Sequence, residues 1–350
     1  MKDFSRKLIG WYEIHRRDLP WRQTTNPYHI WLSEVILQQT RVDQGLSYYL
    51  KFLKLFPTVH DLAGASEDQV LKAWQGLGYY SRARNLHHTA QLVVDHGQGL
   101  FPLNYEGLIK LKGIGPYTAA AIASFAYNEK KPVIDGNVVR VLSRIFGIEH
   151  AIDSKEGKNA IAQLAEELID LRNPASYNQA IMEFGALHCT PRLPQCDTCP
   201  FYSSCFAFAK NRVSDFPVKK KKTRVKNLWI TYFHIDEPRY VWIRKRGLDG
   251  IWKGLYDFPG IESESEPDLG LQLTEFLKSH ALKKRDCVIS SSEPYLHILT
   301  HRRIHARFIH IKTKSKMTNP LADWLRIAKT DLSQYGVPRL VEKYLADDSR

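Results

Sequence analysis

Four cysteines in one short stretch are the strongest chemical signal in this sequence. They follow the spacing C-x6-C-x2-C-x5-C and are Cys189, Cys196, Cys199 and Cys205. Four thiolates from one loop can hold a tetrahedral zinc ion or a four-iron four-sulfur cluster. Zinc usually takes its thiolates from two separated C-x2-C pairs, whereas one compact loop wraps a cubane cluster more naturally. The alternative, buried cysteines without a ligand, requires four fortuitous cysteines in a single loop.

Two glycines one residue apart indicate a phosphate-binding turn. Residues 111–121 read LKGIGPYTAAA, and Gly113 and Gly115 permit a tight turn between two helices. Backbone N–H groups at a helix start can bind a phosphate when no side chain stands in the way. The pattern predicts a helix-hairpin-helix motif, and the alternative is an ordinary turn between helices.

Two carboxyl side chains stand where they could do acid and base chemistry. Asp135 precedes a helix with an apolar face, so it either caps that helix or serves as an anion beside a developing positive charge. Glu34 has Ile30, Trp31 and Leu37 around it at helical spacing. Desolvation there would raise the pKa of Glu34 and keep it protonated near neutrality, as a general acid requires. The alternative is a glutamate at the edge of the stripe that reaches water.

Amphipathic helices must position these groups in the first part of the chain. Apolar periodicity predicts helices over residues 28–39, 81–95, 117–125, 138–146 and 155–171. The segment VSDFPVKKKKTRVK at 213–226 is strongly basic and predicts a solvated linker. We therefore expect a helical domain at 1–212, a linker at 213–226 and a second domain at 227–350.

The second domain is predicted to be a smaller α+β domain. Strand patterns occupy residues 227–235, 239–246 and 304–311, and in the last one Ile304, Ala306 and Phe308 alternate with His305 and Arg307. Helical patterns occupy residues 269–280, 321–329 and 338–346.

Composition indicates a globular protein with a polyanionic partner. The chain has 350 residues, of which 43% are hydrophobic, and this excludes disordered and collagenous classes. Lys and Arg exceed Asp and Glu by 50 − 37 = 13, which favours nucleic acid as the partner. No window approaches the ~18 apolar residues of a membrane span. Clustered cysteines favour a reducing compartment, so we expect a cytoplasmic protein. We also expect a monomer with no membrane partner.

The order of hairpin, aspartate and cysteine loop resembles the helix-hairpin-helix superfamily of DNA glycosylases. The cysteine spacing resembles the iron–sulfur loop of the endonuclease III and MutY family, and LPWR at 19–22 with SEVILQQT at 33–40 resembles the MutY-type adenine DNA glycosylases. The resemblance implies a multi-domain protein, with an all-α helix-hairpin-helix glycosylase domain and iron–sulfur loop followed by a smaller α+β Nudix-like domain. It implies a [4Fe-4S] cluster on the four cysteines, and double-stranded DNA with 8-oxoguanine:adenine or guanine:adenine mispairs as the partner.

The same resemblance implies catalytic roles. Glu34 would protonate adenine at N7, Asp135 would stabilise the oxocarbenium-like sugar, and Tyr117 and Asn137 would orient them. Related enzymes that cleave the DNA backbone carry a lysine after the hairpin glycines, where this chain has Tyr117 after Pro116. The missing amine favours a monofunctional glycosylase. For Tyr117 and Asn137 the alternatives are routine hairpin packing and hydrogen bonding at a helix start.

DNA contacts are implied in the same way. Gln39 and the run GLGYY at 76–80 match family positions that wedge into the base stack, and Lys112 and Arg192 are expected to meet phosphates. The alternatives are core or turn residues for the wedge and solvated surface charges for the cations. The predicted DNA-binding residues are Arg22, Gln39, Leu77, Tyr79, Lys112, Gly113, Gly115, Thr118 and Arg192.

The second domain resembles a Nudix fold that has lost its catalytic helix. GLYDFPG at 254–260 resembles the opening of that fold, but the next residues, IESESEPDLGLQLTEFL, lack an REXXEE-type motif, so we expect a lesion-binding module. Leu299, Thr300 and His301 stand where the family has a Phe-Ser-His turn that probes 8-oxoguanine, and Leu299 cannot stack as Phe would. The alternative is a plain surface turn. His297, His301 and His305 recur every four residues without Cys or carboxylate among them, and we expect no metal there.

Two other functions remain open from the sequence. One is a bifunctional glycosylase and lyase of endonuclease III type, against which the missing lysine argues. The other is a DNA lesion sensor in which Glu34 and Asp135 are only structural.

Overall fold

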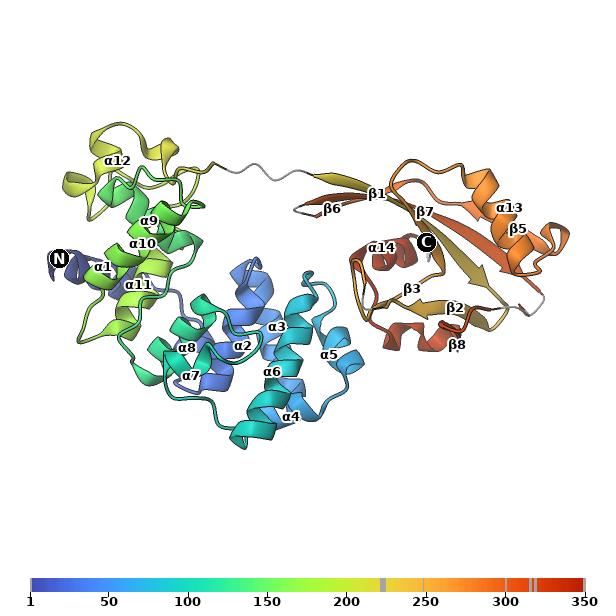
Figure 1. Cartoon of the computed structure of the whole chain (residues 1–350), viewed down its shortest axis with the longest axis horizontal. Helices are drawn as coiled ribbons and strands as arrows, with labels where there is room; N and C mark the ends of the chain where they lie inside the picture. The colour runs from blue at the N-terminus through green and yellow to red at the C-terminus, as the bar shows by residue number, and fades with distance from the viewer. Residues whose placement is uncertain are drawn as a thin grey trace. The chain divides into compact units, whose positions relative to one another are not determined.

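A computed structural model describes residues 2–220, 225–247, 249–299, 301–314, 317 and 320–348. The chain forms two compact units, one of residues 1–64 with 85–221 and the other of residues 65–84 with 222–350. Figure 1 shows helices throughout the first unit and a twisted sheet in the second. No helix among the described residues has the length and apolar character needed to span a bilayer.

The first unit is built from helices of very different lengths, and one helix predicted from periodicity, α9, gains its exact limits from caps. α9 starts after Asp135, whose side chain accepts a hydrogen bond from the backbone N–H of Val138, and it ends at Gly147 in the left-handed conformation. The elements are α1 (Lys2–His15), α2 (Pro27–Leu37), α3 (Val42–Leu55), α4 (Val59–Gly64), the greater part of α6 (Ser81–Gly97), α7 (Tyr105–Leu108), α8 (Pro116–Tyr127), α9 (Gly136–Phe146), α10 (Lys155–Leu168), α11 (Pro174–Leu187) and α12 (Phe206–Ala209).

One apolar core of the first unit combines α1, at the start of the chain, with helices from its later part. α1, α9, α10 and α11 contribute its buried side chains, and Phe201 of the cysteine loop packs into the same cluster. Leu8 and Phe184 are completely buried in it. Burial of aromatic and aliphatic surface of this kind is the main force that fixes the helices, at roughly 1.5–3 kcal/mol for each large side chain. The cysteine loop is therefore part of the core that carries α9.

The predicted hairpin lies between α7 and α8. Gly113 has φ +95, which a residue with a Cβ rarely adopts, and a Cβ there would stand 2.7 Å from Thr89 Oγ1. The hydroxyl of Thr89 donates to the carbonyl of Lys112 at 2.5 Å and fixes the turn. Gly115 is the N-cap of α8, with Pro116 at the first helical position.

The second unit is organised around an eight-stranded sheet with the main order β3-β2-β1-β7-β5. Its two long central strands, β1 and β7, run parallel, and the other pairs are antiparallel. α14 covers one face, and α13 covers part of the other. The elements are α5 (Glu67–Trp74), β1 (Lys226–Asp236), β2 (Tyr240–Lys245), β3 (Tyr256–Asp257), β4 (Gly260–Ser263), α13 (Leu269–Ser279), β5 (Cys287–Ser291), β6 (Tyr295–Leu299), β7 (Arg302–Thr313), β8 (Trp324–Ala328) and α14 (Arg339–Asp348).

The helix predicted over residues 321–329 is wrong. Trp324 to Ala328 form strand β8, which pairs antiparallel with β2. Trp324 and Ile327 are buried three residues apart, a spacing that imitates one face of a helix. Pairing with β2 satisfies the backbone hydrogen bonds of residues 324–328, and this pairing outweighs the helix-like spacing of the buried residues.

The boundaries of the two units differ from the predicted domain limits in two places. Residues 213–220 belong to the first unit, because Phe216 is buried and Ile152 N–H donates to the carbonyl of Val218 at 2.9 Å. Residues 65–84 group with the second unit, where the Tyr256 hydroxyl donates to Asp68 at 2.9 Å and Lys72 donates to the carbonyl of Tyr335 at 3.1 Å. Contacts between residues so distant in sequence leave no local signal.

Candidate active site

One cavity in the first unit brings the predicted acid and the predicted anion together. Its volume is about 720 Å³, within the range of sites that enclose small ligands. Glu34, Tyr117, Asp135 and Asn137 all line it, together with residues of α2, α8, α9 and α11. The carboxyl groups of Glu34 and Asp135, which are 101 residues apart in the sequence, therefore face the same cavity.

Glu34 is held in an apolar environment with a hydroxyl partner. Its side chain lies on α2 and is only 6% exposed, and the Tyr117 hydroxyl donates to Oε2. Burial raises the pKa of Glu34 to about 7, against the opposing effect of this hydrogen bond, and the negative charge of Asp135 adds to the rise. Burial also raises the pKa of Tyr117 well above its ordinary value. Glu34 is thus suited to hold a proton near neutral pH.

Asp135 has a different surrounding, because it is the N-cap of α9. Its Oδ1 accepts from Val138 N–H at 2.7 Å and its Oδ2 accepts from Asn137 Nδ2 at 2.6 Å. Burial raises the pKa of Asp135, although both hydrogen bonds and the nearby Arg140 lower it. The carboxylate is therefore a helix cap and a cavity wall at once, so the two interpretations of Asp135 do not exclude each other.

Asn137 is positioned by a residue that the sequence analysis missed. Arg140 is 8% exposed and donates to Asn137 Oδ1 at 2.9 Å, to the carbonyl of Gly185 at 2.7 Å and to the carbonyl of Cys189 at 2.8 Å. One guanidinium thus connects the cavity wall to the start of the cysteine loop. The only feature of the sequence that pointed to Arg140 was its position one helical turn after Asn137.

Arg22, which we predicted to contact DNA, forms an ion pair within the protein. Its guanidinium binds Glu183 in a bidentate pair at 2.9 and 2.7 Å, and Arg17 binds the same carboxylate at 2.9 and 2.6 Å. Burial alone would raise the pKa of Glu183, but these hydrogen bonds outweigh it and lower the pKa to about 2. All three residues line the cavity. Because Glu183 is 1% exposed, this ion pair forms part of the cavity wall.

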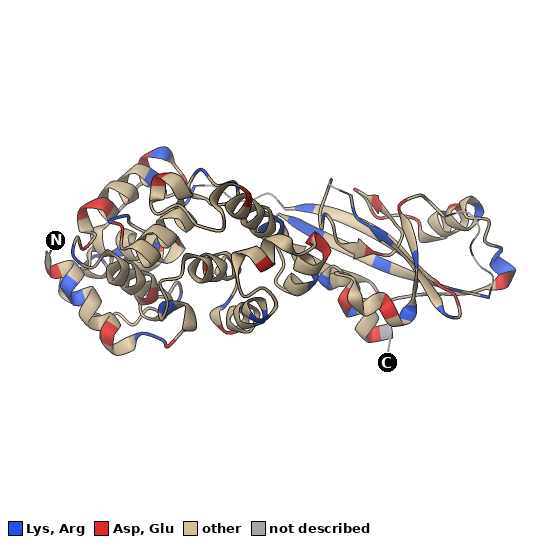
Figure 2. Cartoon of the chain, turned by 90° about the horizontal axis from the view of Figure 1, so that it is seen from below, with Lys and Arg blue, Asp and Glu red and all other residues tan. Residues whose placement is uncertain are grey.

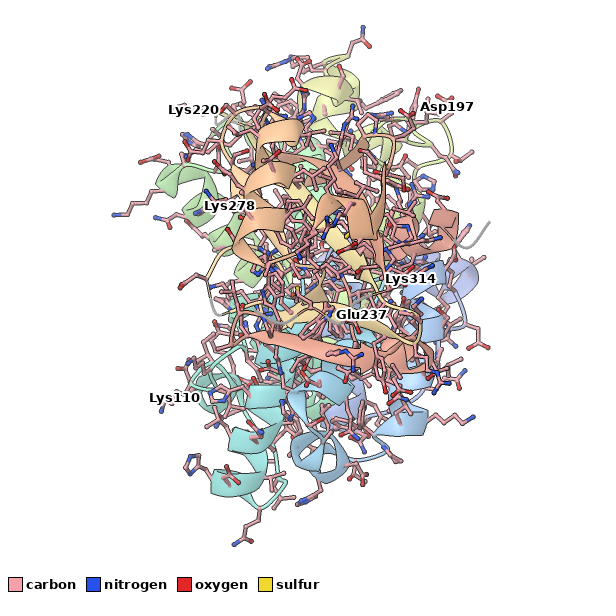
Figure 3. The ribbon with its side chains drawn as sticks, turned by 90° about the vertical axis from the view of Figure 1, so that its right-hand side faces the viewer. Lys110, Asp197, Lys220, Glu237, Lys278 and Lys314 are labelled. Atoms are coloured by element: carbon pink, nitrogen blue, oxygen red, sulfur yellow. The ribbon has the colours of Figure 1, made fainter. Side chains whose placement is uncertain are left out.

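The hairpin residues are mostly open to a partner. Lys112, Gly113 and Gly115 are exposed, whereas Thr118 is 3% exposed and its hydroxyl accepts from Gln38 Nε2 at 3.3 Å. The side chain of Thr118 is therefore committed inside the protein, and only its backbone N–H at the start of α8 remains suited to a phosphate. Lys110, to which we assigned no role from the sequence, is exposed two residues before Lys112 and projects outward (Figure 3).

The three predicted wedge residues differ in exposure. Gln39 is exposed, lines the cavity and has φ 55, so it stands at a sharp bend after α2. In the second unit Tyr79 is 43% exposed with φ 45, and Leu77 is 7% exposed. Leu77 therefore behaves as a core residue, which was its alternative interpretation. The guanidinium of Arg82 lies 5.9 Å from the ring centroid of Tyr79.

The four cysteines surround one small cavity next to the core. Cys189, Cys196, Cys199 and Cys205 all line it, and none is in a disulfide. Arg144, which is 2% exposed, lies with Nη1 3.5 Å from Cys189 Sγ, and Phe201 N–H donates to Cys199 Sγ at 3.4 Å. Buried cationic and N–H donors suit a negatively charged group at this place. Arg192 is exposed in the same loop.

The predicted lesion turn connects β6 with β7. Leu299 is partly buried and packs against the core under α14, His301 is exposed, and Thr300 lies outside the described residues. Within the described part of the chain, the only group of three possible metal ligands with donor atoms within 4.8 Å of one another is His234, Asp236 and His310. Lys329 and His310 already pair with Asp236 there.

The sequence matches two protein families in the order expected. Residues 32–169 match the HhH-GPD superfamily of base excision DNA repair proteins, and residues 231–347 match the NUDIX domain. These matches confirm the expected fold class, a helix-hairpin-helix glycosylase domain followed by a Nudix-like domain with a sheet.

Known relatives cover almost the whole chain. The adenine DNA glycosylase of Buchnera aphidicola subsp. Schizaphis graminum is 33% identical over 349 residues, 98% of this chain and 97% of that protein. The adenine DNA glycosylase of Arabidopsis thaliana is 34% identical over 396 residues, 96% of this chain and 62% of that protein. The solved structure of a thermostable thymine-DNA glycosylase has a TM-score of 0.56 and 30% identity, covering 60% of this chain and 96% of that one. The chain belongs to the adenine DNA glycosylase family of base excision repair N-glycosylases.

Proposed function

We propose that this protein hydrolyses the N-glycosidic bond of adenine mispaired with 8-oxoguanine or guanine in duplex DNA, and that it does so without a lyase step. The observation that carries the proposal is Glu34, a buried carboxyl group whose pKa is raised to about 7 in the cavity that it shares with Asp135. A proton donor and an anion on one cavity are what cleavage of a base from a sugar requires.

The reaction begins with the adenine outside the helix. Flipping the base out of the stack costs a few kcal/mol, and the cavity gives it a place to bind. Glu34 then protonates N7, so that adenine leaves as a neutral base. C1′ gains oxocarbenium character as the bond breaks, and the Asp135 carboxylate stabilises that charge. Water then adds to C1′ and gives its proton to the Glu34 carboxylate, which restores the acid for the next turnover.

Tyr117 and Asn137 act as positioning residues in this scheme. The Tyr117 hydroxyl donates to Glu34, and the Asn137 amide donates to Asp135 at 2.6 Å. Tyr117 also occupies the position where a lysine would be needed for imine formation. A phenol hydrogen-bonded to the acid cannot replace an amine nucleophile, and this supports monofunctional cleavage.

The four cysteines suit a [4Fe-4S] cluster. No three of their sulfur atoms lie within 4.8 Å of one another, whereas Zn–S bonds of about 2.3 Å place thiolates roughly 3.8 Å apart in a tetrahedral site. Burial, followed by the neighbouring thiolates, raises the pKa of the Cys196 thiol, and a bound metal would stabilise the thiolate form. When bound, the cluster would supply a rigid anchor for the loop that Arg140 connects to Asn137.

Lesion specificity is assigned to the turn at residues 299–301. Thr300 offers a hydroxyl where the family has Ser, and His301 is exposed. Leu299 packs into the core of its own domain, so it supplies no stacking surface for the lesion base. We expect the preference for 8-oxoguanine over guanine to depend on hydrogen bonds from Thr300 and His301.

Single-turnover assays on matched duplexes test the proposal. Duplexes with an 8-oxoguanine:adenine, guanine:adenine or thymine:adenine pair are incubated with excess protein, and strand scission is measured before and after alkali. We expect adenine release from the first two only, with scission only after alkali and no adduct on borohydride treatment. Tight binding without an abasic site would show a lesion sensor, and a trapped adduct would show a lyase.

A further inference from the structure

One half of a sheet face in the second unit is not covered by a helix among the described residues. α13 packs on this face against the far ends of β1 and β7, where the rings of Phe233 and Phe276 stack at 3.8 Å. The near ends of the same strands carry two rows of side chains that are exposed or partly exposed. Ile298, Arg303 and Asn227 are paired across β6, β7 and β1, and Leu296, His305 and Trp229 form the next row. We call these two rows, together with Arg307, the open half-face.

The cations of the open half-face are available to a ligand. Arg303 is exposed, and His305 and Arg307 are partly exposed. Within the described residues, neither Arg303 nor Arg307 has a carboxylate within ion-pair distance, in contrast to Arg244 and Arg246 of the same sheet, which pair with Asp257. Two unneutralised guanidinium groups lie on the same face of one strand, four residues or roughly 13 Å apart, which suits two separate phosphates of a backbone better than a single anion.

Aromatic and apolar surface lies between these cations. The rings of Trp229 and His305 stack with centroids 4.9 Å apart and planes 16° apart. Leu296 and Ile298 are 52% and 68% exposed on the neighbouring strand. Apolar groups beside guanidinium groups match a sugar-phosphate backbone, because deoxyribose offers apolar faces between the charges. A purely acidic ligand would leave this apolar surface without contacts.

The elements next to the open half-face show which of its edges is basic and which is acidic. The β6–β7 turn with His301 lies at the end of the open half-face, and Lys226 N–H donates to the carbonyl of His301 at 3.0 Å. Figure 2 shows Lys and Arg positions along the strands of this sheet. On the other edge the chain continues from β4 into the acidic run ESEPD at 264–268. The face is therefore basic on its β7 side, next to the turn.

We propose that the open half-face binds the sugar-phosphate backbone of duplex DNA beside the predicted lesion-reading turn. The inference rests on the proposed function, since it assigns an additional contact to the same substrate. Arg303 and Arg307 meet phosphates, and Trp229, Leu296 and Ile298 contact the sugars between them. The alternation of basic and apolar residues along β7 is thereby explained, because the buried half holds the sheet on α14 and the other half faces DNA.

Salt dependence of binding to an undamaged 30-base-pair duplex tests this surface in the full-length protein. The variant Arg303→Gln/Arg307→Gln removes two charges from the open half-face. The matched control Lys278→Gln/Arg285→Gln removes two exposed charges on and after α13, outside the face; Lys278 projects outward in Figure 3. A second variant, Arg303→Lys/Arg307→Lys, keeps the charge. Because each phosphate contact contributes about 0.9 to the slope of log K against log salt, we expect the first variant to lower the slope by about 1.8.

Affinity should fall roughly 10- to 60-fold at 0.1 M salt for the Gln variant, and the Lys variant should retain most of the slope. An unchanged slope in the Gln variant would overturn the proposal and leave the face to a protein partner. An equal loss in the control would also overturn it, because net charge alone would then explain the effect. The readout needs no base excision, so a failure of the proposed reaction cannot be mistaken for a failure of this surface.

Discussion

Glu34 and Asp135 are carboxyl groups on the same cavity, and their surroundings give them different chemical properties. Burial raises the pKa of Asp135 too, but Asp135 accepts two hydrogen bonds at a helix start that oppose this rise and favour its anionic form. Glu34 accepts one from a phenol and is only 6% exposed on α2, and its burial raises its pKa to about 7. Environments that separate the pKa values of two carboxyl groups are how one site provides an acid and an anion at the same pH.

The rate of adenine release should fall as the pH rises through about 7. Burial holds the pKa of Glu34 at about 7, so the protonated acid is lost above that value and the single-turnover rate should drop about tenfold per pH unit. The measurement is the rate on an 8-oxoguanine:adenine duplex from pH 5.5 to 9. A rate that stays level up to pH 9 would contradict the assignment.

Replacement of Tyr117 should shift the pH at which the rate of adenine release falls. The Tyr117 hydroxyl lowers the pKa of Glu34, so Tyr117→Phe should move the alkaline limb to higher pH while reducing the maximal rate. If Tyr117 had only a structural role, the variant would react more slowly at every pH, and the midpoint of the pH profile would stay at the wild-type value.

The sequence predicted a residue of the cavity only where its neighbours along the chain gave a signal. Glu34 was recognisable because its helical neighbours are apolar, and Asp135 because a capping residue precedes an amphipathic helix. Glu183 had no such signal, since Arg17 and Arg22 lie 166 and 161 residues away in sequence. The family pattern suggested DNA contact for Arg22, and only the fold shows its buried partner.

At the scale of elements, the close approach of α9 and α11 sets the position of the cavity wall. Gly185 of α11 faces the start of α9, where a Cβ would stand 2.6 Å from Asn137 Cβ and 3.1 Å from its Cα. The carbonyl of Gly185 also accepts from Arg140 at 2.7 Å. A glycine is therefore required in the last turn of α11, because two backbones approach closely there.

Gly185→Ala should impair catalysis by displacing Asn137 and Asp135. We expect the single-turnover rate to fall at least tenfold, because contacts of 2.6–3.1 Å with backbone and Cβ atoms cannot be relieved by a rotamer change. The matched control is Gly10→Ala in α1, where nothing lies within 4 Å of the added methyl group. That control should keep wild-type activity and gain up to about 1 kcal/mol in stability. Equal rates for both variants would refute the role of this contact.

Periodicity predicted most elements of the fold, and its failure has a physical cause. α9 and α13 follow the expected spans closely because caps at Asp135 and Asp268 mark their starts. Residues 321–329 failed because the strand partner of β8, Tyr240–Lys245, lies some 80 residues earlier in the chain. Sheet pairing is a long-range property, so local spacing could not distinguish this strand from a helical turn.

At the scale of the whole molecule, the chain consists of two compact units with separate cores. The cysteine loop belongs to the core of the first unit, where Phe201 is buried against Phe4 at a ring distance of 4.8 Å. The second unit has its own core between the sheet and α14. Loss of a metal site should therefore destabilise one unit directly.

Cys199→Ser should lower the melting temperature of the first unit alone. A missing thiolate prevents four-fold ligation of the expected cluster, and binding free energy of such sites contributes to folding. Differential scanning calorimetry should show two transitions in the wild type and a shift of one in the variant, with loss of visible absorbance and of bound iron. Cys287→Ser, outside the loop, is the control and should change neither iron content nor absorbance. A full complement of iron in Cys199→Ser would refute the ligand assignment.

The most direct test of the central claim is adenine release by Glu34→Gln. Because the pKa of Glu34 is raised in the folded state, this acid stabilises the fold below about pH 4.5 and loses that contribution as the pH rises to about 7. The glutamine variant should therefore be no less stable than the wild type at pH 8, and it should bind an 8-oxoguanine:adenine duplex with unchanged affinity. We expect its single-turnover rate to fall at least a hundredfold. A rate within threefold of the wild type would contradict the assignment of Glu34 as the acid.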